Sequence, residues 1–211
     1  MKKTFFYTLL ISAASLILGL MFWSSIPQSM PVHWDAMGNA NGFAPKALGL
    51  FLMPACSALT AAILLAVAAK SKDRRNDRAL QRIAILISIF MFSMQALMVH
   101  AAMKTDFVFS MSLFLVALGA LVAAVGTTMP MLHPNIIAGV RTPWNNSSDI
   151  NWQVTHRAAK WCMIAGGVVA AGAGLLLTPP SAFWVGFAAI LLGSVAPIGV
   201  SYTVHCVQNE R

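Results

Sequence analysis

Residues 134–160, PNIIAGVRTPWNNSSDINWQVTHRAAK, form the longest polar interval in a chain that is otherwise mostly apolar. The interval contains two tryptophans, two arginines, one histidine and four asparagines. A second polar stretch, residues 27–46, follows the first apolar run. Because the apolar runs carry few ionisable side chains, we expect the function to reside in these two loops.

The composition is that of an integral membrane protein. Of 211 residues, 58% are hydrophobic and 9% are charged, whereas a soluble domain carries about 25% charged residues. The formal net charge of +8 is explained by basic residues that flank membrane segments, so no direct contact with nucleic acid is expected. The cysteines lie in apolar runs, without the spacing of a disulfide framework or a metal site: Cys56, Cys162 and Cys206.

The apolar runs predict an all-α, polytopic integral membrane protein with about six transmembrane helices. The first run follows two lysines like a signal peptide, but it is longer than the apolar region of about 7–15 residues that signal peptides carry. We therefore expect it to remain as the first helix. The predicted runs are residues 4–26, 47–69, 83–103, 107–128, 161–177 and 183–205.

Two units are predicted from the positions of the loops. Residues 1–70 form an N-terminal two-helix unit with an extracytoplasmic loop at 27–46. Residues 71–211 form a four-helix unit with a cytoplasmic loop at 129–160.

The distribution of lysine and arginine predicts the orientation. Six crossings place both termini on one side, together with the central loop. That side carries 12 of the 14 basic residues, and cytoplasmic loops are the ones enriched in Lys and Arg. Both termini are therefore predicted to lie in the cytoplasm. The 12 residues are Lys2, Lys3, Lys70, Lys72, Arg74, Arg75, Arg78, Arg82, Arg141, Arg157, Lys160 and Arg211, against Lys46 and Lys104 on the other side.

Within the central loop, local chemistry predicts a turn followed by a helix. Gly139 permits a tight turn, and Ser148 is a suitable N-cap for a helix that leads into the fifth crossing. On that helix Trp152 and His156 are four residues apart and share a face. Arg141 presents a planar fork of donors that suits carboxylate or phosphate.

Two uses of this loop are consistent with the residues. It can be an interfacial elbow in which Arg141, Arg157 and Lys160 contact lipid phosphates. It can also be a docking surface for a cytoplasmic partner.

The outer loop, which is the predicted extracytoplasmic loop at residues 27–46, contains His33 and Asp35, two residues apart. Metal binding needs more ligands than these, and the loop offers no third one, although His100 or Asp106 can approach from another loop. We expect no metal and no other cofactor. Gly38 and Gly42 are predicted to lie in turns. Catalytic signatures such as HExxH, GxSxG and the P-loop are absent from the sequence, so no catalytic residue is assigned and the protein is not predicted to be an enzyme.

The fifth run carries small residues at a spacing of four: Gly166, Ala170 and Gly174. Such a stripe allows two helices to approach closely, and we predict that it serves internal packing rather than a homodimer. No Asp or Glu lies mid-span, which argues against a proton- or ion-coupled pump. A transporter of small solutes would need a polar path, and Gln95 is one of few mid-span polar residues.

Two stretches together resemble the SdpI family of bacterial membrane proteins. The central loop is similar to the family pattern N-x-x-x-G-[IV]-R-T-P-W, followed by a spaced Trp and Thr-His-Arg. Asn145-Asn146 stands where the family commonly has Thr-Leu. The matching residues are Asn135, Gly139, Arg141, Thr142, Pro143, Trp144, Trp152, Thr155, His156 and Arg157.

The outer loop resembles a domain that often precedes this one, with the pattern P-x-H-[FW]-N-x-x-G-x-x-[DN]-G-[FWY]-x-x-K. Asp35 stands where asparagine is usual. The matching residues are Pro31, His33, Trp34, Gly38, Asn41, Gly42, Phe43 and Lys46.

The resemblance implies a multi-helix inner-membrane protein that gives immunity to a secreted peptide toxin. It also implies signalling, in which the protein holds a cytoplasmic transcriptional repressor at the membrane when toxin is present. The expected partners are therefore membrane lipids, a toxin and a repressor. Alternatives are a small-solute transporter or exporter, and a metal-dependent membrane enzyme that uses His33, Asp35 and further ligands.

Under the first hypothesis each loop has its own role. The outer loop senses the toxin. The central loop, from here on called the inner loop because it is predicted to face the cytoplasm, reports it. The predicted sensing residues are His33, Trp34, Asp35, Gly38, Gly42 and Lys46, and the centre of the reporting face is Arg141, Trp144, Trp152, His156 and Arg157.

Overall fold

A computed structural model describes the chain except for residues 71–72, 136–137, 147 and 211. The described part contains six helices that are long and apolar enough to cross a membrane, which confirms the predicted helical membrane fold. They are α1 (Lys2–Met21), α2 (Lys46–Lys70), α3 (Arg74–Ala102), α4 (Met111–Thr128), α5 (Asp149–Leu176) and α6 (Ser181–Asn209).

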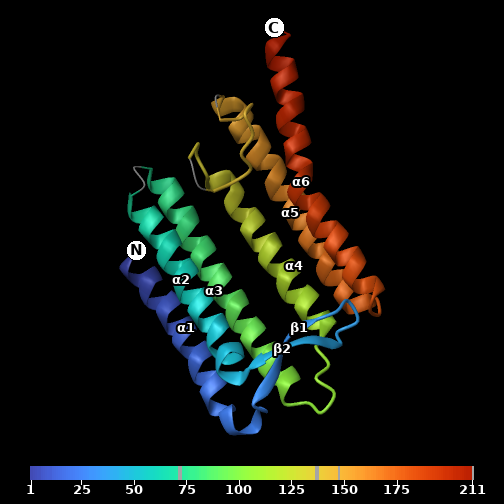
Figure 1. Ribbon diagram of the computed structural model, residues 1–211. Helices are drawn as coiled ribbons and strands as arrows, with labels where there is room; N and C mark the ends of the chain where they lie inside the picture. Colours follow the sequence, from blue (N-terminus) through green and yellow to red (C-terminus); the bar gives the residue numbers. More distant parts are fainter. Residues whose placement is uncertain (71–72, 136–137, 147, 211) are drawn as a thin grey trace.

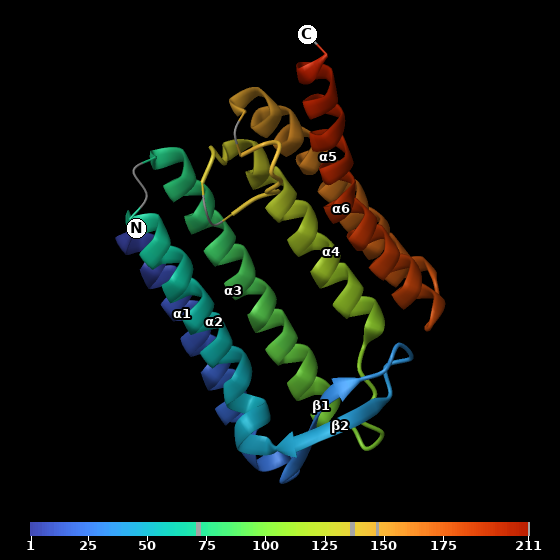
Figure 2. The same cartoon turned by 45° about the horizontal axis from the view of Figure 1, so that its top comes forward.

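The helices form two neighbouring groups. α3 packs mainly against α1 and α2, whereas α5 packs against α4 and α6. Figure 1 shows both ends of the chain at one end of the bundle and the strands at the other. Figure 2 shows the connection between α4 and α5, which contains the central loop, at the same end as the termini. The predicted boundary between the two units falls at residues 70–71, and residue 71 lies outside the described residues.

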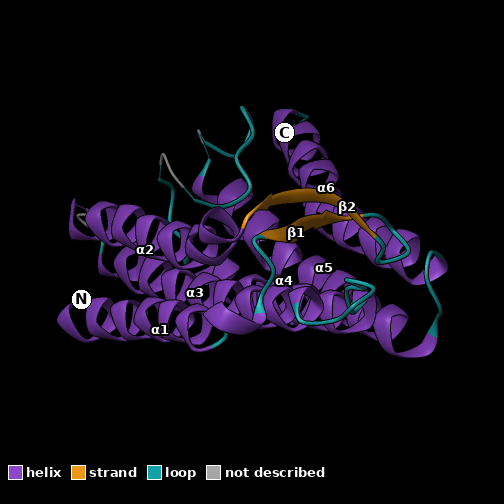
Figure 3. Ribbon diagram, turned by 60° about the horizontal axis from the view of Figure 1, so that its bottom comes forward, coloured by secondary structure: helices purple, strands orange, loops and turns teal. Residues whose placement is uncertain are grey.

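The outer loop forms an antiparallel hairpin, which the sequence analysis did not predict. β1 (Ser29–Trp34) pairs with β2 (Ala40–Pro45), and Figure 3 shows the hairpin lying across the end of the bundle. Gly38 occupies the turn with φ +89°, as expected. Gly42 instead lies in β2 opposite His33, where an added Cβ would come within 2.9 Å of the Cβ of His33.

Three of the described helices, α3, α4 and α5, begin after a polar side chain that caps them. α5 begins at Asp149 after Ser148, whose hydroxyl accepts a hydrogen bond from the backbone N–H of Asn151, as predicted. α3 begins nine residues before the predicted apolar run at residue 83. The reason is that Asp73 caps the helix through the N–H of Arg75 at 2.7 Å, so the charged segment is the first part of the helix rather than a loop.

The small residues of α5 serve internal packing, as predicted. An added Cβ at Gly166 would lie 2.5 Å from the carbonyl oxygen of Ala189 in α6, and one at Gly174 would lie 2.8 Å from that of Ser112 in α4. Gly167 approaches α4 more closely still, because an added Cβ there would lie 2.3 Å from the carbonyl oxygen of Gly119. α5 is therefore held between α4 and α6 by backbone-to-backbone contact.

Candidate functional site

The hairpin is fixed to the connection between α3 and α4. The indole Nε1 of Trp34 donates to the carbonyl of Phe107 at 2.8 Å, and its ring stacks on Phe109 with centroids 4.7 Å apart. The N–H of Phe109 donates to the carbonyl of Gly38 at 2.9 Å. Trp34 and Gly38, two of the predicted sensing residues, thus hold the hairpin against the connection between the two groups of helices.

The polar residues of the hairpin contact one another. Asp35 Oδ1 accepts hydrogen bonds from the N–H groups of Met37 and Asn39, both at 2.9 Å. The bond from the Asn39 backbone is the main cause that lowers the pKa of Asp35. His33 Nδ1 lies 2.5 Å from Oδ1 of Asn41. Among the described residues, no three His, Cys, Asp or Glu side chains form a cluster that could hold a metal ion.

Lys46 is buried, with only 8% of its surface exposed. Its ammonium donates to the carbonyls of Trp23 at 3.2 Å and Ile26 at 3.4 Å, and it lies 4.6 Å from the ring centroid of Trp23. A cation held by two carbonyls and an aromatic face is satisfied within the protein. Lys46 therefore fixes the end of α1 to the start of α2.

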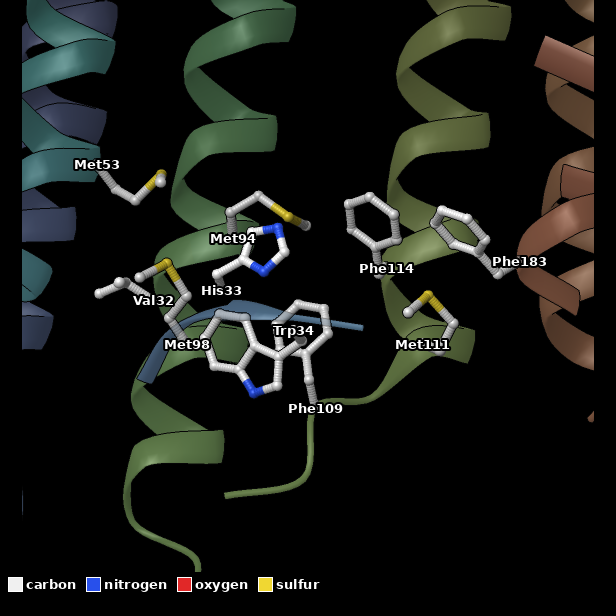
Figure 4. A pocket seen from close by; sticks show the side chains of 10 residues that line it. All are labelled: Val32, His33, Trp34, Met53, Met94, Met98, Phe109, Met111, Phe114 and Phe183. Carbon is white, nitrogen blue, oxygen red and sulfur yellow. The ribbon is translucent and has the colours of Figure 1, made fainter. Parts of the chain in front are cut away.

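An apolar pocket of about 240 Å³ lies beneath the hairpin. Figure 4 shows the lining side chains, which come from the hairpin, α2, α3, α4, α6 and the connection between α3 and α4. His33 belongs to the lining but is an exposed residue, and its Nδ1 contacts Asn41. Methionine is flexible and polarizable, so a pocket rich in it adapts to ligands of different shape. The lining residues are Val32, His33, Trp34, Met53, Met94, Met98, Phe109, Met111, Phe114 and Phe183.

At the opposite end, Gly139, Trp152 and His156 form the centre of the inner loop. Gly139 has φ +104°, and an added Cβ would lie 2.2 Å from Nε2 of His156. That nitrogen accepts from the N–H of Val140 at 3.2 Å, and Nδ1 donates to the carbonyl of Trp152. The two rings stack with centroids 4.2 Å apart. His156 is 1% exposed, and its two nitrogens join the loop at Val140 to the backbone of α5 at Trp152.

A buried hydrogen-bond network joins the loop to α5 and α6. The Thr142 and Ser201 hydroxyls lie 2.7 Å apart, and Ser201 also donates to Asn151 Oδ1 at 3.1 Å. Thr155 donates to the same oxygen at 2.9 Å. Asn145 accepts from the N–H of Thr142 and donates to a backbone carbonyl of the loop. These groups are satisfied by one another, which fixes the loop in one conformation.

Other predicted residues of the loop lie nearer its surface. Asn135 is partly buried. Its side-chain amide donates to the carbonyl of Ala138 and accepts from the N–H of the same residue. Trp144 is partly buried against Tyr202 and His205. Three predicted residues are exposed: Arg141, Pro143 and Arg157.

The structure adds polar residues that the sequence analysis did not select. Asn145, Asn151 and Ser201 are buried within the network, and Asn76 of α3 accepts from the N–H of His133 at 2.8 Å. Only Ser201 carried a signal of position, because it is an uncharged polar residue within the predicted apolar run 183–205. Asn76, Asn145 and Asn151 lie in polar segments, where such residues do not stand out. Asn145 was noted instead as a departure from the family pattern.

The mid-span residue Gln95 serves helix packing. It is fully buried and donates to the carbonyl of Leu50 at 3.1 Å. It therefore links α3 to α2 and does not by itself form the polar path that the transporter alternative requires.

Comparison with known proteins identifies two regions. Residues 10–57 match a domain of unknown function, DUF1648, and residues 131–201 match the SdpI/YfhL protein family. The chain is 21% identical over 174 residues to Immunity protein SdpI of Bacillus subtilis (strain 168), covering 81% of each protein. No solved structure matches the chain.

The six apolar helices and this similarity define a multi-pass bacterial membrane protein. Residues 131–201, which contain most of the inner loop and of the last two helices, are similar to the SdpI/YfhL family.

Proposed function

We propose that the protein gives a bacterial cell immunity to a secreted antimicrobial peptide, by binding rather than by catalysis. The observation that carries the proposal is the family match of residues 131–201, together with similarity to an immunity protein over 81% of both chains. The apolar pocket beneath the hairpin supplies a place for the peptide.

The proposed orientation places the hairpin outside the cytoplasm. Lys72 and Arg211 lie outside the described residues, which leaves 12 of the 14 basic residues. Of these, 10 belong to the end with the termini and the inner loop, and two, Lys46 and Lys104, belong to the hairpin end. The excess at one end supports a cytoplasmic position for the termini. A peptide that arrives from outside then meets the hairpin first.

The proposed ligand is an apolar segment of the peptide. The pocket is lined mainly by methionines and aromatic rings, and the exposed His33 adds a polar group to the lining. Burial of one large apolar side chain of the peptide contributes about 1.5–3 kcal/mol to its binding. Since the walls come from both groups of helices, a bound peptide contacts both.

We further propose that the inner loop reports binding to a cytoplasmic repressor. The buried network fixes the shape of the loop, while Arg141, Pro143 and Arg157 remain exposed at its surface. These three residues offer two charges and a rigid apolar ring to a partner.

Survival of a sensitive bacterium tests the proposal. Cells that express the wild type are expected to withstand at least one secreted antimicrobial peptide of a panel at a concentration about tenfold higher than cells with an empty vector. Val32→Phe fills the pocket and should abolish this protection. Val185→Phe is the matched control, because Val185 is exposed on α6, and it should protect like the wild type. If no peptide distinguishes wild-type cells from empty cells, the proposed immunity is wrong.

A further inference from the structure

A polar cavity of about 160 Å³ lies at the end of the bundle that carries the termini. Its polar lining comes from three separate segments: Arg75 of α3, His133 of the inner loop, and Gln153, His156 and Arg157 of α5. It is distinct from the apolar pocket beneath the hairpin and lies at the opposite end of the helices.

The charges around this cavity favour an anion. Arg75 Nη1 donates to Nε2 of His133 at 2.9 Å, and His133 Nδ1 in turn lies 2.5 Å from Asp73. The carboxylate of Asp73 therefore contacts the imidazole, while the two guanidinium groups of Arg75 and Arg157 line the cavity. Gln153 adds an amide donor from the same face of α5, four residues before Arg157.

An apolar groove lies beside this cavity, between α3 and α4. Arg82 is seven residues after Arg75, which places both on one side of α3. Arg82 Nη1 contacts the sulfur of Met131 at 3.2 Å, and a thioether is a weak acceptor. The groove encloses about 240 Å³ and continues from Arg82 along Ile85, Leu86, Ala124 and Thr127.

We propose that this end of the protein binds a phosphate group, that of an anionic phospholipid. The head-group phosphate lies in the polar cavity between Arg75 and Arg157, because a guanidinium fork matches the geometry of phosphate oxygens. An acyl chain lies in the groove between α3 and α4. A cationic cavity next to an apolar groove, at the level where the helices leave the membrane, fits a lipid better than a free anion.

Retention of lipid by the purified full-length protein tests the proposal. The protein in neutral detergent is mixed with phosphatidylglycerol, with phosphatidylcholine or with inorganic phosphate, and the thermal shift and the lipid bound in native mass spectrometry are measured. Phosphatidylglycerol is expected to raise the melting temperature and phosphatidylcholine to leave it unchanged. An equal rise with phosphatidylcholine would overturn the site.

Paired variants separate the cavity from general surface charge. Arg75→Gln with Arg157→Gln should lower the affinity for phosphatidylglycerol by about tenfold or more for each arginine, because each removes charge-assisted donors. Arg74→Gln with Arg78→Gln removes the same charge outside the cavity and should bind like the wild type. Equal loss in both pairs would overturn the site. If inorganic phosphate alone raises the melting temperature and only the first pair of variants abolishes that rise, the cavity binds the free anion and the proposed lipid is wrong.

Discussion

Gly167→Leu is expected to prevent α4 and α5 from packing. A Cβ at residue 167 would lie 2.3 Å from the carbonyl oxygen of Gly119 and 2.8 Å from the N–H nitrogen of Ala123. Both are backbone atoms, so no side-chain rotation relieves the contact. Overpacking of a core costs about 1–3 kcal/mol, and more where the surroundings cannot yield. We expect a loss at or above about 3 kcal/mol and little monodisperse protein in detergent.

Gly172→Leu is the matched control for this substitution. It lies on the same helix, and an added Cβ there meets no atom within 4 Å. Its melting temperature and its size-exclusion profile should equal those of the wild type. If Gly167→Leu were also to purify with an unchanged melting temperature, the close approach of α4 and α5 described above would be wrong.

Gly139→Ala is expected to disorder the inner loop. At φ +104° an alanine is strained, which costs about 1–3 kcal/mol. Its Cβ would also lie 2.2 Å from His156 Nε2, so His156 would have to release the N–H of Val140. Leaving the buried Nε2 of His156 without its hydrogen bond costs about 1–3 kcal/mol more. The expected result is a lower melting temperature and rapid proteolysis within residues 133–148.

Two further variants show whether the contact with His156 is the cause. Gly199→Ala lies in α6, where an added Cβ meets nothing within 4 Å, so it should leave proteolysis unchanged. His156→Ala removes the imidazole that Gly139→Ala would strike. The double variant should therefore lose less stability than the sum of the single variants. Strict additivity would contradict the described packing.

The helices were predictable because lipid imposes a simple requirement on sequence. A segment that crosses the membrane must be long and apolar and must satisfy its backbone internally, and such segments are visible without knowledge of tertiary contacts. The start of α5 was equally visible, since Ser148 and Asp149 act on the adjacent backbone. The start of α3 was missed although its cap at Asp73 is equally local, because the prediction followed hydropathy, which places the apolar run at residue 83.

The hairpin and the environments of the loop residues depend on contacts between distant parts of the chain. Trp34 bonds Phe107, 73 residues away, and Thr142 bonds Ser201, 59 residues away. No local pattern specifies such pairs. For the same reason the sequence did not indicate that Lys46 is buried against the carbonyls of Trp23 and Ile26. The roles assigned to these residues in sensing and reporting remain predictions.

Site-specific photo-crosslinking in living cells tests most directly whether the protective peptide enters the outer pocket. A photo-reactive phenylalanine analogue replaces Phe183, which lines the pocket, or the adjacent Trp184, which is 60% exposed on α6. Cells are exposed to the peptide against which the wild type protects and are then illuminated. The proposed function predicts a covalent adduct between protein and peptide at position 183 and little at 184. Equal adducts at both positions, or an adduct only at the opposite end of the helices, for example at Gln153 of α5, would contradict it.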